Sequence, residues 1–184
     1  MRDIIRMVVV LTSIAAASGI ALSAVYRITR EPIEYQSIKF VKEPAVKKVL
    51  TGYDNDPIAD RKKIVVGTDE RGRPLEVTVF PAKRGGEVFA VAIEGRGKGY
   101  HGTIGVMVGI GKDGGVLDIG ITSHSETPGV GSKVTEPSFT DQFRGLKGTV
   151  AVDALSGATY SSRGVVMAVE QAAGLVERFR EELF

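Results

Sequence analysis

A run of uncharged residues near the N-terminus constrains this chain more than any other feature. The run extends from Met7 to Tyr26, with a pair of arginines on each side. At a rise of about 1.5 Å per residue, a helix of this length crosses a hydrocarbon core of about 30 Å. A cleaved signal peptide is the alternative, and Ala21, Ser23 and Ala24 form a weak cleavage pattern. Because signal peptides have a shorter apolar segment of about 7–15 residues, we expect an uncleaved transmembrane anchor.

The charges around this run do not decide which side of the membrane the remainder occupies. Arg2 and Arg6 precede the run, whereas four basic residues follow it, namely Arg27, Arg30, Lys39 and Lys42. Counted simply, the positive-inside rule places the body of the protein in the cytoplasm. Long domains are translocated largely regardless of charge. The residues alone therefore leave the orientation open.

Composition excludes several classes of function. The chain has 184 residues, with 24 basic and 22 acidic side chains and a net charge of +2. The basic residues are scattered, so we expect no nucleic-acid partner. The chain contains no cysteine, which excludes disulfides, thiol catalysis, thiolate-bound zinc and protein-ligated iron–sulfur clusters. Any redox chemistry would therefore need another cofactor.

The remaining residues predict a single α+β domain with a mainly antiparallel sheet, closed by a C-terminal helix. We expect an anchor segment over residues 1–30, a helical stalk over 31–51 in which Pro44 marks a break or the first turn of a second helix, and a domain over 52–184. A tight hairpin is expected at Asp113-Gly114. The other predicted elements are strands over 63–68, 74–80, 87–94, 102–110, 115–122 and 149–152, short helical turns over 134–143, and a helix over 161–183.

Three motif-like patterns carry less weight than they first suggest. A G-x-G-x-x-G pattern begins at Gly109, but a strand-like segment follows it where a dinucleotide fold requires a helix. The glycine-rich stretch over 95–102 lacks the order of a phosphate-binding P-loop, and we interpret it as a bend that permits close backbone approach. His101 and His124 have no partner at metal-ligand spacing, so we expect no metal site. No G-x-S-x-G elbow of a serine hydrolase occurs either.

The stretch DALSGATYSS, residues 153–162, connects a predicted strand to the last predicted helix. Such a turn gathers backbone N–H groups at the positive end of a helix dipole, which favours a phosphate. The alternative is that Thr159 or Ser161 only caps the helix, a role that these residue types often have. These residues alone are compatible with either a helix cap or a phosphate site.

Two motifs resemble a known family. DALSGAT, residues 153–159, resembles the acceptor signature D-x-x-[ST]-G-A-[ST] of proteins that carry flavin mononucleotide (FMN) through its phosphate on the last residue. HSETPGVG, residues 124–131, is similar to the E-T-P-G-[LVI]-G loop that accompanies it. With the anchor, the whole chain resembles the G subunit of the Rnf ion-translocating electron-transport complex. The C subunit of the sodium-pumping NADH:quinone reductase is a related, typically longer alternative.

The resemblance implies roles for individual residues. Thr159 becomes the covalent FMN acceptor, and Asp153 the carboxylate that the modifying flavin transferase recognises or that holds the turn. No residue is expected to be catalytic in its own right. The residues expected to form the turn and line the cofactor pocket are Ser156, Gly157, Ala158, Glu126, Thr127, Gly129 and Gly131.

The resemblance also implies a function and a location. The protein is expected to relay electrons within a complex that couples ferredoxin and NAD oxidoreduction to ion translocation. Its partners would be the other membrane subunits, the flavin transferase and the membrane itself. The protein would cross the inner membrane once, with its C-terminal domain on the extracytoplasmic side. A non-redox anchored scaffold and a stand-alone flavoprotein reductase are the alternatives.

Overall fold

The computed structural model describes residues 2–69, 71–148 and 150–184. The chain forms two compact units, one ending at Phe40 and the other comprising Val41–Phe184. The helices are α1 (Arg2–Ser37), a π-helical turn η1 (Ile38–Lys42), α2 (Glu43–Val49), η2 (Gly131–Thr135), α3 (Pro137–Thr140), η3 (Asp141–Phe143), α4 (Thr159–Arg178) and α5 (Arg180–Leu183). The strands are β1 (Lys62–Thr68), β2 (Pro74–Arg84), β3 (Glu87–Lys98), β4 (Thr103–Gly111) and β5 (Val116–Ser123).

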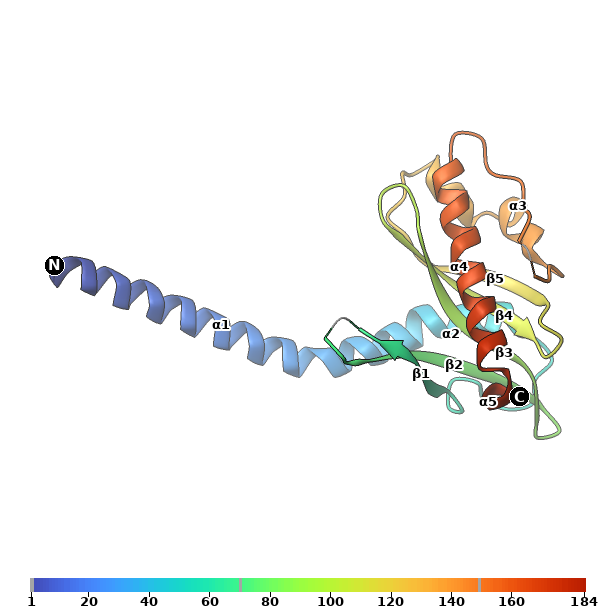
Figure 1. Ribbon diagram of the computed structural model, residues 1–184, viewed down its shortest axis with the longest axis horizontal. Coiled ribbons are helices and arrows are strands. Elements are labelled where there is room, and N and C mark those ends of the chain that lie inside the picture. Colours follow the sequence, from blue (N-terminus) through green and yellow to red (C-terminus); the bar gives the residue numbers. More distant parts are fainter. Residues whose placement is uncertain (1, 70, 149) are drawn as a thin grey trace. The chain divides into compact units, whose positions relative to one another are not determined.

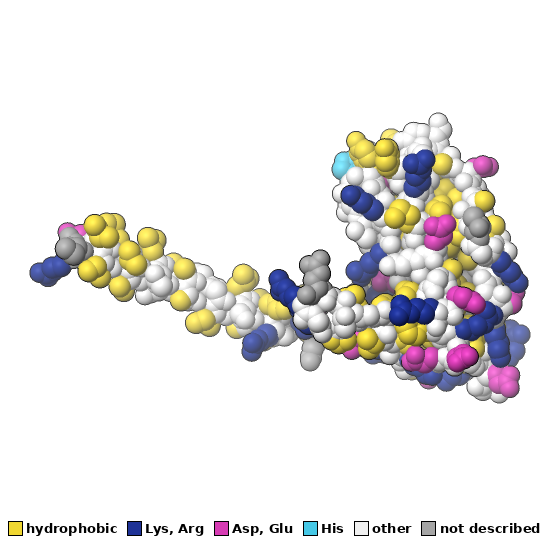
Figure 2. All heavy atoms as spheres, viewed as in Figure 1, with side chains coloured by type: hydrophobic (Ala, Val, Ile, Leu, Met, Phe, Trp, Pro, Cys, Tyr) yellow, Lys and Arg dark blue, Asp and Glu magenta, His cyan; other side chains and the backbone are white. Residues whose placement is uncertain are grey.

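The described part of the first unit consists of the long helix α1 and the first three residues of η1. Its segment Arg2–Arg30 is long and apolar enough to cross a membrane, and its hydrophobic side chains are exposed along the helix. Hydrophobic side chains follow one another along this helix (Figure 2), and arginines precede and follow the apolar run in the sequence. In the second unit, Pro44 lies in the first turn of α2, as predicted. The predicted division at residues 30 and 51 remains a prediction.

The second unit is built on a five-stranded meander with the order β1-β2-β3-β4-β5, in which every neighbouring pair is antiparallel. The two faces of the sheet carry separate apolar clusters. On one face Val91 and Ile93 of β3 pack with Val165 and Val169 of α4. On the other face Ala90, Ala92 and Met107 pack with Val46 and Val49 of α2. The two helices therefore cover opposite faces of the sheet (Figure 1), and the predicted α+β class is confirmed.

Strand β3 is longer than predicted and includes the first half of the glycine-rich stretch, residues 95–98. Gly95 pairs with Val106 and Gly97 pairs with Ile104 of β4. A Cβ atom built on Gly97 would lie 1.9 Å from the carbonyl oxygen of Gly164 in α4. The close backbone approach that the glycines suggested is therefore present, and the neighbouring segment is α4. Only residues 99–102 form the bend between β3 and β4.

The predicted strand over 149–152 is wrong for residues 150–152, and residue 149 lies outside the described residues. The segment has no strand pairing, and its apolar side chains Val150 and Val152 pack instead against the main core cluster. The residue that follows this segment bonds to a side chain, since the amide of Asp153 donates to Oε1 of Gln142 at 2.8 Å. Apolar burial in this segment therefore does not require a sheet.

Candidate FMN site at the start of helix α4

The DALSGATYSS stretch forms a tight turn followed directly by α4. The amide of Ala158 donates to the carbonyl of Leu155 at 3.0 Å, which closes the turn. Gly157 occupies its third position with a φ of 76°, a conformation that favours glycine. The buried Ser162 hydroxyl accepts from the amide of Leu155 and donates to the carbonyl of Ala158, each at 3.0 Å. The hydroxyl of Ser162, a residue of the helix that follows, therefore stabilises the turn.

Neither Thr159 nor Ser161 caps the helix, so that alternative is wrong. The cap position is Ala158, and α4 begins at Thr159, two residues before the predicted start. The Ser161 hydroxyl is buried and donates to Oε2 of Glu126. No side chain among the described residues caps the first amides of α4, which therefore have no partner within the helix. The exposed Thr159 hydroxyl stands beside these amides.

Glu126 joins the three segments that surround this helix start. Its Oε1 accepts from the amide of His101 at 3.0 Å, and its Oε2 accepts from the amide of Tyr100 at 3.1 Å and from the Ser161 hydroxyl. Its side chain is only 4% exposed. Burial raises the pKa of Glu126, whereas the hydrogen bonds from Ser161 and from the amides of the 100–102 bend lower it. The hydrogen bonds together have the larger effect, so the pKa of Glu126 lies below its usual range. The carboxylate is therefore charged at neutral pH.

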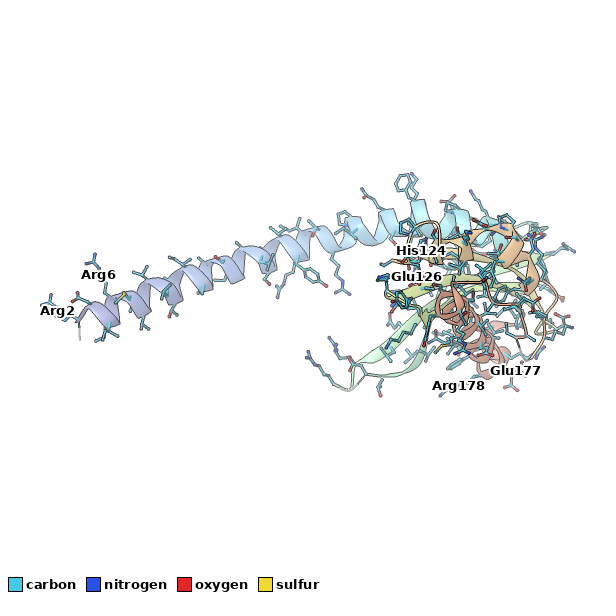
Figure 3. The ribbon with its side chains drawn as sticks, turned by 90° about the horizontal axis from the view of Figure 1, so that it is seen from above. Arg2, Arg6, His124, Glu126, Glu177 and Arg178 are labelled. Atoms are coloured by element: carbon cyan, nitrogen blue, oxygen red, sulfur yellow. The ribbon has the colours of Figure 1, made fainter. Side chains whose placement is uncertain are left out.

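The E-T-P-G loop folds back on itself next to Glu126. The carbonyl of Thr127 accepts from the amides of Val130 and Ser132, at 3.2 and 3.1 Å. The Thr127 hydroxyl lies 3.3 Å from Nδ1 of His101. Gly129 has a φ of 74°, and its amide donates to the Ser132 hydroxyl. Figure 3 shows Glu126 and its neighbour His124 at one end of the domain, with Glu177 and Arg178 near the other end of α4.

Two cavities share Thr159 as part of their lining. The Glu126 cavity has a volume of about 440 Å³ and the Arg163 cavity about 770 Å³, both within the usual range of ligand pockets. The Glu126 cavity is lined by Tyr100, Glu126, Thr127, Val130, Gly131, Gly157, Ala158, Thr159, Tyr160 and Ser161. The Arg163 cavity is lined by Gln142, Val150, Ala151, Val152, Asp153, Ala154, Thr159, Ser162, Arg163, Val166 and Met167.

The structure brings most of the predicted site residues together. Glu126, Thr127, Gly131, Gly157, Ala158 and Thr159 meet at the Glu126 cavity. Asp153 lines the other cavity, and its carboxylate makes no hydrogen bond within the part of the chain that the structure describes. Ser156, Gly129 and His124 line neither cavity.

Two tyrosines and an arginine lie at the site without having been assigned to it from the sequence. Tyr100 and Tyr160 are both exposed, with ring centroids 6.2 Å apart, and they form an aromatic rim on the Glu126 cavity. Arg163 lines the larger cavity with Thr159. Tyr160 and Arg163 follow Thr159 closely in sequence, and this proximity could have indicated that they belong to the site. Tyr100 is brought to the site by the pairing of β3 with β4.

The sequence of this chain is similar to a described domain family and to proteins of known name, and these similarities identify its family. A family described as "FMN-binding domain" matches residues 99–174, which include β4, β5 and most of α4. The G subunit of the proton-translocating ferredoxin:NAD(+) oxidoreductase complex of Clostridium ljungdahlii is 31% identical to this chain, with 92% of this chain and 89% of that protein covered. The G subunit of the ion-translocating oxidoreductase complex of Cereibacter sphaeroides is 33% identical, covering 90% of this chain and 81% of that protein.

The chain belongs to the G-subunit family of ion-translocating oxidoreductase complexes. The resemblance to the Rnf G subunit is thereby confirmed. Among solved structures, NqrC of Shewanella oneidensis has a TM-score of 0.52 and 25% identity, over 78% of this chain and 73% of NqrC. This member of the G-subunit family therefore resembles both families that its two motifs suggested.

Proposed function

We propose that the chain is an electron-transferring flavoprotein subunit of a membrane-bound ion-translocating oxidoreductase complex, and that it carries FMN covalently on Thr159. One observation carries this proposal: the acceptor motif and the E-T-P-G loop, which are far apart in sequence, line a single cavity at the start of a long helix. The assignment to such a complex is based on the names of the similar proteins, which are G subunits of oxidoreductase complexes. Its other subunits are the partners of this chain.

The residues present fit a flavin phosphodiester. The uncapped amides of α4 can donate to phosphate oxygens, and the helix dipole favours a negative charge there. The tight turn at Gly157 leaves the Thr159 hydroxyl exposed to a modifying enzyme. The aromatic rim of Tyr100 and Tyr160 offers surfaces for a planar ring. When bound, FMN would supply the capacity to accept and donate one or two electrons, which no side chain of this chain provides.

Attachment requires an activated donor and an enzyme. The Thr159 oxygen forms a bond to phosphorus and loses its proton, while a phosphoanhydride of the donor breaks. A flavin dinucleotide supplies such a bond, with a nucleoside monophosphate as the leaving group. We therefore propose a flavin transferase as a maturation partner. The Asp153 carboxylate, exposed and unpaired among the described residues, is suited to recognition by that enzyme.

The attachment is tested on the full-length protein purified from its native membrane. A flavin-fluorescent band after denaturing electrophoresis, together with an intact mass raised by FMN less water, is expected for the wild type. Thr159→Val should give a dark band of unchanged abundance, and Thr51→Val, an exposed threonine far from the turn in sequence, should stay fluorescent. A dark wild-type band, or fluorescence that survives Thr159→Val, would contradict the proposal.

Expression without a flavin transferase separates covalent from noncovalent binding. In such a host the protein is expected to be colourless, because the site lacks the bond that retains the cofactor. Co-expression of the transferase should restore the colour. A yellow protein in the deficient host would instead show that the pocket holds flavin without the bond.

We also propose that α1 anchors the protein in the inner membrane, with the second unit on the extracytoplasmic side. The length and composition of Arg2–Arg30 support a membrane span. A tethered cofactor suits that side, since a covalent bond prevents its loss by dilution. A C-type subunit of a sodium-pumping quinone reductase is the second candidate, because the fold resembles NqrC. The subunits that co-purify with the protein distinguish the two complexes.

A further inference from the structure

Arg163 lies one helical turn after Thr159 and lines the same cavity. Residues four apart on a helix lie on one face, with Cβ atoms about 5–6 Å apart. The Arg163 side chain is exposed, and it makes no hydrogen bond or ion pair with any residue in 2–69, 71–148 or 150–184. A long cationic side chain beside the acceptor hydroxyl is therefore free to bind a group attached there.

The charges around Thr159 favour the use of this cation when an anion is attached there. Asp153 lines the Arg163 cavity and Glu126 lines the other, so each of the two cavities that share Thr159 contains a carboxylate. Among the described residues that line the two cavities, Arg163 is the one cation. A phosphodiester on Thr159 carries a negative charge that both carboxylates oppose. A guanidinium offsets that repulsion and matches the two free phosphate oxygens with two parallel N–H donors.

We infer that Arg163 binds the flavin phosphodiester on Thr159 and positions it against the first turn of α4. This inference rests on the proposed attachment of FMN. Arg163 is a positioning residue in this role, because it contacts the phosphate and not the reacting ring. It sets the direction in which the remainder of the cofactor leaves the helix.

Phosphorus NMR of the flavinylated full-length protein in detergent tests this contact directly. The native resonance should differ from that of the urea-unfolded protein. Arg163→Gln should move the native resonance toward the unfolded value, and Arg163→Lys should retain more of the difference. Arg178→Gln is the matched control, since it removes the same charge from the last turn of the same helix. Its resonance should equal that of the wild type.

A salt titration of the wild-type holoprotein gives a second measurement that needs no variant. Because Arg163 is exposed, raising the salt concentration to about 1 M should screen the pair and move the resonance in the same direction as Arg163→Gln. A flavinylated Arg163→Gln protein with the wild-type resonance, or a wild-type resonance that does not respond to salt, overturns the inference alone. Wild-type protein with neither flavin mass nor a phosphorus signal overturns the proposed attachment instead.

Discussion

Glu126 is the side chain on which the geometry of the cofactor site depends most. Its two oxygens accept hydrogen bonds from the bend after β3 and from the first turn of α4, while its own backbone belongs to the E-T-P-G loop. Three segments that are separated in sequence are therefore connected through one carboxylate. A buried network of this kind is stable only when every donor has an acceptor.

Glu126→Gln should lower the free energy of unfolding by about 1–3 kcal/mol at neutral pH. Both native oxygens face donors, so the amide NH₂ of glutamine would leave at least one donor without an acceptor. Urea denaturation followed by circular dichroism measures the change. Glu136→Gln, at the exposed position just before α3, is the control and should change stability by less than about 0.5 kcal/mol. Equal losses in the two variants would contradict this role of Glu126.

The acid sensitivity of the domain should depend on the same carboxylate. The pKa of Glu126 is lowered in the folded protein, because hydrogen bonds to the charged form outweigh the effect of burial. The unfolded chain therefore binds the proton more tightly, and the stabilisation by Glu126 is complete above the unfolded pKa and lost as pH falls through the folded pKa. The difference in melting temperature between the wild type and Glu126→Gln should shrink as pH falls below about 4. A difference that stays constant to lower pH would contradict the lowered pKa.

The sequence motifs identified Glu126, Thr127 and Thr159 as site residues, but they assigned neither the aromatic rim nor Arg163. Gly157 lies in the turn over residues 155–158, and Thr159 follows this turn directly as the first residue of α4. Tyr100 reaches the cavity only because β3 and β4 pair over nine positions. The Ser161 hydroxyl was predicted as a possible cap, and its bond to Glu126 could not be foreseen from spacing because the two residues are 35 positions apart.

At the scale of elements, the contact between α4 and β3 determines where the helix begins relative to the sheet. Gly95 and Gly97 of β3 present no side chain to the helix, whose backbone oxygens lie 1.9 Å from where their Cβ atoms would be. Gly164 of α4 faces the strand in the same way. This contact brings the first turn of α4 next to the 99–102 bend. The acceptor threonine is therefore positioned by glycines that carry no chemistry of their own.

Gly97→Ala should lower the free energy of unfolding by at least about 1–3 kcal/mol. The new methyl group would overlap a backbone oxygen of α4, which cannot move aside as a flexible side chain could. The shift of α4 should also reduce the fraction of protein that carries flavin. Gly67→Ala in β1 is the matched control, since a Cβ there meets nothing within 4 Å. Thermal unfolding and the ratio of flavin to protein measure the two effects. Equal melting temperatures for the two variants would show that the close contact is not required.

The sequence prediction for these elements was wrong where tertiary packing outweighs local preference. The meander and the long last helix were predicted from apolar period and turn residues, and both are present. The third strand was predicted to end at residue 94, with the glycine-rich stretch after it forming a bend, although glycine in general weakens a strand. The packing of α4 reverses that preference, since only glycine permits the observed approach. Pairing of residues 150–152 was predicted from local composition, but the apolar side chains Val150 and Val152 pack against the main core cluster without it.

At the scale of the whole molecule, the proposed orientation conflicts with the simplest count of charges. Four basic residues follow the apolar run and two precede it, so the positive-inside rule favours a cytoplasmic domain. The conflict is mild, because a second unit of this size is a long segment whose translocation depends little on flanking charges. An experiment that reports on each side of α1 separately is therefore needed.

The absence of native cysteine makes single-cysteine labelling a direct test of orientation. Thr51→Cys introduces an exposed thiol just after α2, and Asp3→Cys introduces one near the start of α1. In intact spheroplasts a membrane-impermeant maleimide should label Thr51→Cys, whereas Asp3→Cys should react only after lysis. Labelling in the reverse pattern would place the domain in the cytoplasm, as the charge count favours. Labelling of both before lysis would show that α1 does not cross the membrane, and the intact mass of the labelled protein would reveal whether α1 has been cleaved.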